Sequence, residues 1–230
     1  MAKMFVLIPK KPGLADQDFH HHWLTTHAAL ARRITALDKY CQSHADPELT
    51  ARLARKPFAA SGFLGVSEAW FRSADEALSM TSTAEYRDGA LPDEENFMDV
   101  ANKARLFTTK VTSSSNGPER PAPVKLMLFS ERRRDVDADT FARHWAGEHT
   151  GMLHALPRLA GHTQRLVDSR AGAASLPDWS FVDELWWRTE SDLRAAWASP
   201  ATARLLESAR RLTTDRSVVL AAREHRIIWP

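Results

Sequence analysis

The stretch Phe19-His20-His21-His22-Trp23-Leu24-Thr25-Thr26-His27 lies near the start of the chain. A second stretch shares its skeleton, F-x-x-H-W-x-x-x-H, and runs Phe141-Ala142-Arg143-His144-Trp145-Ala146-Gly147-Glu148-His149. Both ends of the motif are displaced by the same 122 positions (141 − 19 and 149 − 27). Chance rarely repeats four such residues at identical spacing, so the sequence predicts two copies of one unit.

Helical spacing sorts the histidines of the motif. On an α-helix, Phe19, Trp23 and His27 fall on one stripe that continues through Leu30, Ile34 and Leu37, and such a stripe faces a core. His22 borders this stripe, about 140° away from His27 at 100° per residue. His20 and His21 are expected to point towards solvent. The equivalent stripe of the second copy carries Phe141, Trp145, His149, Met152 and Leu156.

Hydrophobic pattern and turn residues predict the same order of elements twice. In the first half, strands are expected over 4–8, 39–44, 62–71 and 106–111, and helices over 15–37 and 73–87, with short helical pieces in 46–58 and 93–98. In the second half, strands are expected over 124–129, 161–166, 179–187 and 226–229, and helices over 137–156 and 190–211. The order β-α-β-β-α-β is the ferredoxin-like arrangement. We therefore divide the chain into a first repeat (1–112), a linker rich in Ser, Gly and Pro (113–123) and a second repeat (124–230).

Composition excludes several classes of protein. The 230 residues are 43% hydrophobic, which suits two units that each bury a core. The formal net charge is +2, so charge favours neither nucleic acid nor an acidic membrane as a partner. The single cysteine, Cys41, excludes an internal disulfide and fits a reducing compartment. With no signal-peptide pattern and no apolar span, we expect a cytoplasmic protein.

The duplicated unit resembles the EthD domain family, which belongs to the dimeric α+β barrel superfamily. The features that carry the resemblance are F-x-x-H-W-x-x-x-H after a strand, a strand with aromatic-x-Gln (Tyr40, Gln42) or His-x-Gln (His162, Gln164), and a strand with Glu-x-Trp. The resemblance implies an α+β fold in which two four-stranded sheets pair face to face. A tandem chain would then form this barrel internally, as a pseudo-dimer, and a homodimer of the whole chain is possible.

His27, His149, Tyr40 and His162 are the candidate catalytic residues. A histidine on an apolar face needs a hydrogen-bond partner, and beside a pocket it can act as a general acid or base near neutral pH. Tyr40 and His162 occupy the same position of the repeat and would share a pocket with the helix histidines. The alternative is structural: each histidine ties its helix to the sheet, and each strand residue only contacts the interior.

Six further residues are candidates for substrate binding: Gln42, Gln164, Trp23, Trp145, Glu68 and Glu184. The glutamines would orient a carbonyl, or bond across the sheet. The tryptophans would stack on an aromatic ligand, or simply fill the core. A carboxylate amid aromatic residues would have a raised pKa suited to a base, or would pair with a Lys or Arg of a strand.

No metal site is expected, because consecutive histidines diverge on a helix and no ligand motif is present. No cofactor is expected either. The pattern, together with the resemblance, favours a cofactor-independent enzyme that acts by general acid/base chemistry on a small hydrophobic, aromatic or cyclic metabolite. A lyase (dehydratase) or isomerase step is the leading reaction. Two alternatives stay open: a cofactor-free or haem-dependent oxidoreductase of the monooxygenase type, and a non-catalytic binding protein.

Overall fold

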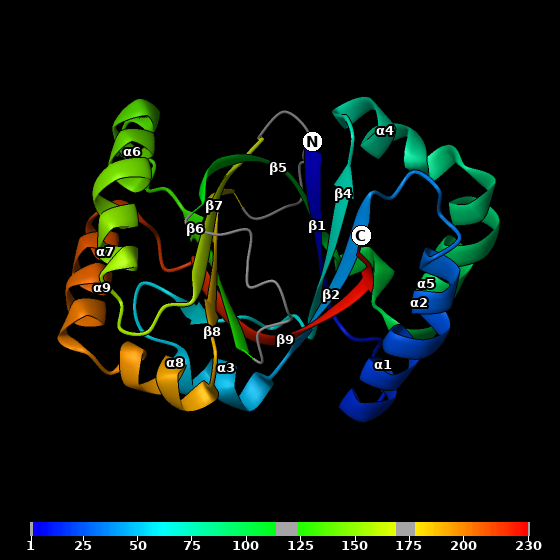
Figure 1. Ribbon diagram of the computed structural model, residues 1–230, viewed down its shortest axis with the longest axis horizontal. Helices are drawn as coiled ribbons and strands as arrows, with labels where there is room; N and C mark the ends of the chain where they lie inside the picture. The colour runs from blue at the N-terminus through cyan, green and yellow to red at the C-terminus, as the bar shows by residue number, and fades with distance from the viewer. Residues whose placement is uncertain (1, 114–123, 169–177, 230) are drawn as a thin grey trace.

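The computed structural model describes residues 2–113, 124–168 and 178–229, and a closed β-sheet lies at its centre (Figure 1). The strands are β1 (Ala2–Ile8), β2 (Lys39–Ala45), β3 (Ala59–Ala60), β4 (Gly65–Phe71), β5 (Ala104–Ser113), β6 (Val124–Glu131), β7 (Gly161–Val167), β8 (Trp179–Trp187) and β9 (Val218–Ile228). They follow the order β2-β4-β1-β5-β7-β8-β6-β9, and a β2–β9 pairing closes the ring. The short β3 adds to β9 in parallel.

The two halves of the chain contribute four strands each in the same relative order. The first half reads β5-β1-β4-β2 and the second reads β9-β6-β8-β7. Antiparallel pairings between β5 and β7 and between β2 and β9 join the halves. The predicted linker, 113–123, lies outside the described residues apart from Ser113, which ends β5.

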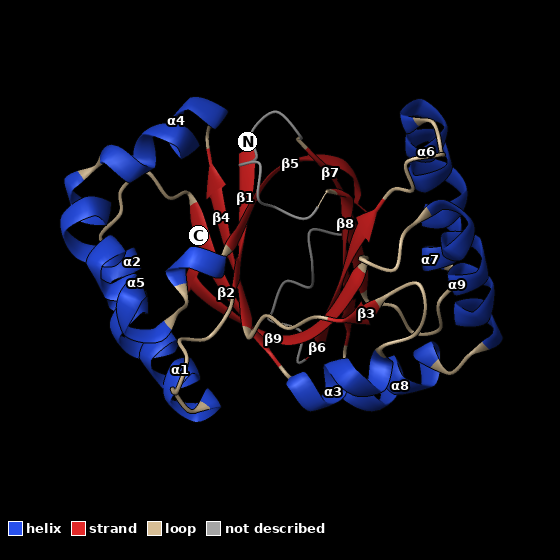
Figure 2. Cartoon of the chain, turned by 180° about the vertical axis from the view of Figure 1, so that it is seen from behind, coloured by secondary structure: helices blue, strands red, loops and turns tan. Residues whose placement is uncertain are grey.

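Helices cover the outside of the barrel (Figure 2). One side carries α1 (Asp16–His22), α2 (Ala28–Ala31), α4 (Ala74–Ser79) and α5 (Leu91–Phe97). The opposite side carries α6 (Ala138–His144), α7 (Thr150–His154) and α9 (Pro200–Leu212), while α3 (Pro47–Leu53) and α8 (Glu190–Trp197) lie near one end. Local sequence explains where α4 and α6 begin. The side chains of Ser73 and Asp137 accept hydrogen bonds from backbone N–H groups three residues on, as N-caps do.

Several predicted elements differ from the structure. The helix expected over 73–87 is α-helical only over Ala74–Ser79 and is followed by a 3-10 turn over Met80–Ser82. The predicted helix over 190–211 is two helices, because Ser199 caps α9 and Pro200 starts it, so the backbone turns there. The last strand begins at Val218 rather than Arg226, since the apolar run from Val218 pairs with β6. The motif helix is not a regular α-helix: Trp23–His27 and Trp145–His149 are π-helical turns in both halves.

Strand alternation divides the buried side chains between two sides of the sheet. Facing outwards, towards the helices, the apolar side chains form separate cores. Trp23 and Phe97 belong to one of them, and Trp145 belongs to another that also includes Leu49 and Leu53 of α3. Facing inwards, the barrel is filled in part by apolar side chains such as Phe5 and Phe129. The rest of the interior is charged, as described below.

Candidate functional site

The π-helical turn of the first half brings two histidines onto one carboxylate. His22 Nε2 lies 2.8 Å from Asp93 Oδ1, and His27 Nδ1 lies 3.0 Å from Asp93 Oδ2. The expectation that residues five apart diverge was wrong here. A π-helix bonds residue i to i+5, so the widened turn places His22 and His27 on one face.

Asp93 is held as a carboxylate between these rings. Burial alone would raise its pKa, but hydrogen bonds from His27, Asn96 and His22 outweigh burial and lower the pKa of Asp93 well below its usual value. An ionised carboxylate only accepts hydrogen bonds, so His27 must donate from Nδ1. The neutral ring then has Nε2 as its acceptor, and Nε2 has no hydrogen-bond partner among the described residues.

His27 and Tyr40 line one small cavity of about 50 Å³ between the sheet and the helices of the first half. The hydroxyl of Tyr40 accepts a hydrogen bond of 3.3 Å from Trp23 Nε1. Burial raises the pKa of Tyr40, so its phenol stays protonated. Arg105 also lines the cavity, and its Nε is buried without a partner among the described residues. A potential base, a neutral acid and a cation therefore meet at one space.

The equivalent histidine of the second half is enclosed. His149 is 0% exposed and stacks on Trp145, with ring centroids 3.7 Å apart. Its Nε2 is 3.5 Å from Asp183, and neither ring nitrogen has a good hydrogen bond among the described residues. Burial lowers the pKa of His149, and nearby Asp183 opposes this only in part. His149 therefore packs as a neutral ring inside a closed core.

Asp183 organises the polar residues of the second half. It accepts hydrogen bonds from Trp145 Nε1 (3.0 Å) and Gln164 Nε2 (3.0 Å), and its Oδ1 lies 2.9 Å from His162 Nε2. Burial would raise the pKa of Asp183, but the nearby rings of His149 and His162 lower it. The structure thus brings His149 and His162 onto one acid, as Asp93 does for His22 and His27. The acid comes from a strand in one half and from a helix in the other.

One strand position accounts for the different setting of the two tryptophans. Gly65 lies beneath Trp23, and a Cβ added there would be 2.4 Å from the indole ring. The equivalent position, 116 later (181 − 65), holds Phe181, whose ring centroid is 6.3 Å from that of Trp145. In the first half, the indole of Trp23 occupies the space above Gly65. In the second half, Phe181 fills the equivalent space, so Trp145 lies against His149 instead.

The two predicted glutamines have similar contacts in both halves. Gln42 Nε2 donates to the carbonyl oxygen of Trp23 (2.8 Å), and Gln164 Nε2 donates to that of Trp145 (3.2 Å). Each glutamine therefore ties a π-helical turn to the sheet. The carbonyl oxygen of Trp23 also accepts a hydrogen bond from the backbone N–H of Ala28, and that of Trp145 accepts one from the hydroxyl of Thr150, so each glutamine is a second donor.

Glu68 and Glu184 lie on the other side of the sheet, inside the barrel. Lys3 Nζ is 2.6 Å from both carboxylates, and Lys125 Nζ is 2.5 Å from Glu68 and 2.9 Å from Glu184. The pairing with strand lysines, foreseen as the alternative for these glutamates, is present. Their predicted role in substrate binding would have to take place inside the barrel, away from His27.

The remaining histidines of the motif are on the surface or near it. His21 is exposed, but His20 is half-buried, and its Nδ1 is 2.9 Å from Nδ1 of His44. The expectation that His20 faces solvent was therefore wrong, because β2 presents His44 beneath it. His44 in turn stacks on Trp23, with centroids 4.3 Å apart.

Sequence reasoning missed Asp93, Arg105 and the lysine pair. Asp93 and Arg105 lie far from the motif in the chain, and no local pattern connects them with it. Lys3 and Lys125 were detectable, since they repeat with the same 122-residue offset (125 − 3) as the motif.

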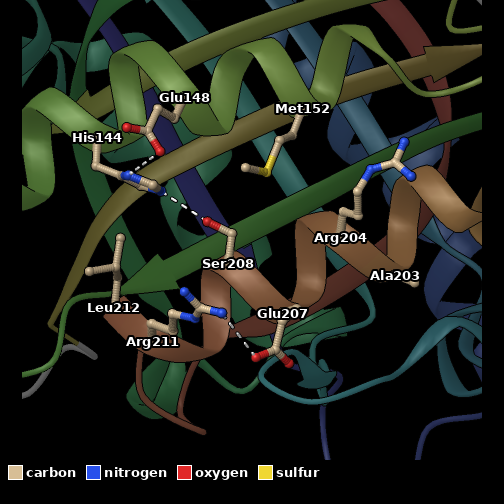
Figure 3. Close-up of a pocket in the computed structure, with 9 residues that line it drawn as sticks. All are labelled: His144, Glu148, Met152, Ala203, Arg204, Glu207, Ser208, Arg211 and Leu212. Atoms are coloured by element: carbon tan, nitrogen blue, oxygen red, sulfur yellow. Dashed lines mark hydrogen bonds and ion pairs between the residues drawn. The ribbon is translucent and has the colours of Figure 1, made fainter.

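A larger cavity lies away from these residues. It is an open groove of about 700 Å³ between α6–α7 and α9, lined by His144, Met152 and Ser208 among others (Figure 3). Within it, His144 lies between Ser208 Oγ (3.0 Å from Nε2) and Glu148 (3.3 Å from Nδ1). None of the ten predicted site residues lines this groove, so its size does not indicate the reactive site.

Neither histidine setting fits a haem. The His27 cavity of about 50 Å³ is far below the roughly 300–1,000 Å³ of ordinary ligand pockets, and its Nδ1 is engaged by Asp93. His149 lies in a filled core. In the described part of the chain, no group of three or more His, Cys, Asp or Glu residues is arranged to hold a metal ion.

Comparison with known proteins gives a family match within the first half and fold likenesses over the whole chain. Residues 11–101 match the EthD domain. An anthrone oxidase-like protein superposes with a TM-score of 0.67 at 10% identity, over 98% of this chain and 92% of that one. A protein from Lactobacillus acidophilus that has been assigned as a monooxygenase superposes with a TM-score of 0.57 at 11% identity, over 100% of this chain and 99% of that one.

A chlorite dismutase from Candidatus Nitrospira defluvii gives a TM-score of 0.52 at 10% identity, over 96% of this chain and 90% of that one. At such low identities these likenesses show the fold alone, an α+β barrel of the dimeric type. A comparison with curated proteins found no match. Among the described helices, none has the length and apolar character needed to cross a bilayer.

Proposed function

Since residues 11–101 form an EthD domain, we propose that the chain is an enzyme that uses His27 as a general base on a small hydrophobic metabolite. The observation that supports this most is the His27–Asp93 pair at a cavity shared with Tyr40 and Arg105. A carboxylate that holds one ring nitrogen orients the other, as in hydrolytic triads. General base catalysis of this kind contributes about 10²–10⁴-fold.

The chemistry would begin with removal of a proton from carbon. Nε2 of His27 takes a proton from a C–H bond next to a carbonyl, and the electron pair of that bond moves onto the carbonyl oxygen. Arg105 and the protonated Tyr40 would stabilise the resulting oxyanion. Asp93 would stabilise the imidazolium that forms.

Two outcomes of this step fit the leading assignment. In a dehydration, the electron pair returns to expel a β-hydroxyl group, which leaves as water with the proton from His27. In an isomerisation, His27 returns the proton to a different carbon. A substrate with a ring is larger than the present cavity, so binding would require the π-helical turn Tyr86–Ala90 and α5, which cover it, to move outwards.

An oxidoreductase is the second candidate, supported by the names of two structural relatives, the anthrone oxidase-like protein and the assigned monooxygenase. It would start from the same proton removal. Dioxygen, the co-reactant, would then add to the carbanion and, with the proton from His27, give a hydroperoxide. Loss of water from the hydroperoxide would leave a new carbonyl group. Uptake of dioxygen separates this reaction from dehydration and isomerisation.

Proton removal is tested with anthrone and 2-tetralone, two cyclic aromatic ketones with acidic C–H bonds. The protein is incubated with each in D₂O, and deuterium incorporation is followed by NMR while an electrode records dioxygen. We expect catalysed exchange that His27→Gln reduces by about 10²–10⁴-fold. His149→Gln is the matched control and should retain the wild-type rate.

Wild-type exchange by His27→Gln would overturn the assignment of the base. Saturable binding of a ketone without exchange or dioxygen uptake would favour the non-catalytic alternative.

We also propose how the barrel arose. The identical strand order of the halves supports a tandem duplication of a ferredoxin-like β-α-β-β-α-β unit, with residues 1–112 and 124–230 as the repeats. The first unit would have kept a reactive histidine, His27, and in the second unit the equivalent His149 would have a structural role. A homodimer of the whole chain is compatible with this arrangement, and sedimentation of the purified protein tests it.

A further inference from the structure

A second cavity lies inside the barrel, on the opposite side of the sheet from His27. Its volume is about 330 Å³, within the range of ordinary ligand pockets. Alternation along β1 and β4 explains the separation: Met4 and Ala69 line the His27 cavity, while their neighbours Lys3 and Glu68 line this one.

Cations outnumber carboxylates in this cavity. Among the described residues, its lining has five cations, Lys3, Lys39, Lys110, Lys125 and Arg165, against three carboxylates, Glu68, Glu184 and Glu224. Arg226 Nε lies 2.8 Å from Glu224 and neutralises it. Of the described lining cations, Lys3, Lys125 and Arg165 are buried, and they face the two remaining carboxylates, an excess of one positive charge (3 − 2). A buried excess of positive charge is unfavourable unless an anion balances it.

Arg165 is placed to receive that anion. Its Nε donates to Glu184 at 2.8 Å, and its side chain is 10% exposed. Its two terminal nitrogens, Nη1 and Nη2, have no partner among the described residues. Arginine presents nitrogens as a planar fork whose geometry matches a carboxylate in two parallel hydrogen bonds.

Tryptophan rings surround the rest of the cavity. Trp70, Trp186 and Trp229 line it, and Trp70 meets Trp229 edge to face at 5.6 Å. Lys39 Nζ lies 4.7 Å from the centroid of Trp229. Indole faces bind flat aromatic rings by stacking. The cavity therefore combines a guanidinium fork with aromatic walls.

We propose that the barrel interior is a binding site for a small aromatic carboxylate, with its carboxylate on the Arg165 fork and its ring among the three tryptophans. This site is separate from the proposed reactive site at His27 and does not depend on it. Lys39, which is partly exposed, adds positive charge beside the same aromatic wall.

Calorimetric titration of the full-length protein with benzoate tests the proposal. Benzyl alcohol (the ring without the charge) and acetate (the charge without the ring) are titrated in parallel. We expect saturable binding of benzoate, and binding of both partial analogues weaker by about tenfold or more, which is 1.4 kcal/mol. Equal affinity for acetate would overturn the aromatic part, and equal affinity for benzyl alcohol would overturn the carboxylate part.

Variants locate the site. Arg165→Lys keeps the charge but loses the fork, so benzoate should bind about tenfold more weakly. Lys39→Gln should weaken benzoate binding less than Arg165→Lys does, and it should leave the aromatic contacts unchanged. The matched control is Arg158→Gln, because Arg158 is exposed and pairs only with Asp192 in the described structure; it should bind benzoate normally. No saturable binding by wild type, or unchanged binding by Arg165→Lys, would overturn the proposal.

Discussion

At the scale of single residues, the partner of a histidine decides what its ring can do. His27 has a carboxylate on Nδ1 and a cavity beside it, whereas His149 has an indole face and no free space. Both were chosen from the sequence for one reason, their place on a buried helical face. That reason predicted burial correctly, but burial is common to both and does not separate a reactive ring from a packed one.

Asp93→Asn tests the orientation of His27. An asparagine keeps the shape of the side chain but can present its NH₂ group to Nδ1 and so favour the wrong tautomer. We expect deuterium exchange with the ketone probes to fall by about 10²–10⁴-fold, with little change in probe affinity. His22→Gln removes the other ring on Asp93 and serves as the comparison, with a smaller loss. Equal rates in wild type and Asp93→Asn would exclude this pair from the mechanism.

His44 makes the protein sensitive to acid. Burial, then the charges of His225 and His20, lower the pKa of His44 to about 2. The unfolded chain takes up a proton near pH 6.5, so it binds more protons than the folded one below that pH, and stability falls as pH falls. Between pH 6.5 and 5 we expect a loss of about 2 kcal/mol from this residue.

Urea unfolding of wild type and His44→Gln at pH 8 and pH 5 measures that loss. The variant should lose correspondingly less stability between the two pH values, whatever its stability at pH 8. His21→Gln, at an exposed ring, should behave as wild type. An identical loss in wild type and His44→Gln would show that other groups cause the acid sensitivity.

At the scale of elements, the indole of Trp23 lies directly over Gly65, so a helical turn and a strand are in close contact. An added Cβ would lie 2.4 Å from the indole, so Gly65→Ala forces the ring or the strand to shift. We expect a loss of about 1–3 kcal/mol in urea unfolding. Gly62→Ala, where a Cβ meets nothing within 4 Å, should change stability little. A loss no larger at position 65 than at 62 would mean that Trp23 is loosely held.

Strands and most helices were predictable from the pattern of apolar residues and caps, whereas the π-helical turns were not. A wheel drawn at 100° per residue assumes a regular helix, and the extra residue in each turn changes which side chains share a face. That single departure is why His22 and His27 were expected to diverge and instead meet at Asp93. The break at Pro200 was visible in the sequence and was overlooked, because the apolar pattern continues across it.

At the scale of the whole molecule, four charged side chains hold the halves together. Lys3 of the first half contacts Glu184 of the second, and Lys125 of the second contacts Glu68 of the first. Lys3→Met would leave two buried carboxylates with less compensation, so we expect a loss of about 3–5 kcal/mol. Lys10→Met removes an outer pair with Asp16 and should lose no more than about 1 kcal/mol.

Adding Glu184→Gln to Lys3→Met should restore part of the lost stability, because it removes a carboxylate that the lysine had balanced. If stability does not recover, the loss in Lys3→Met comes from poor packing of the methionine and not from unbalanced charge.

The repeat made the two halves predictable, and the family resemblance implied an internal barrel, but the strand pairings that close it were not predicted. Internal symmetry shows that a unit occurs twice, and only the pairings of β5 with β7 and of β2 with β9 show how the copies meet. Those partners lie in different halves, so no local signal reports them.

The β2–β9 pairing also has a consequence for the order of synthesis. On the ribosome β2 emerges early, while β9, the strand that borders it, emerges only after every other strand. Until then the nascent chain carries an open strand edge, which is a site for pairing with other chains. We therefore expect the edge of β2 to stay open to such pairing until β9 (Val218–Ile228) has left the ribosome.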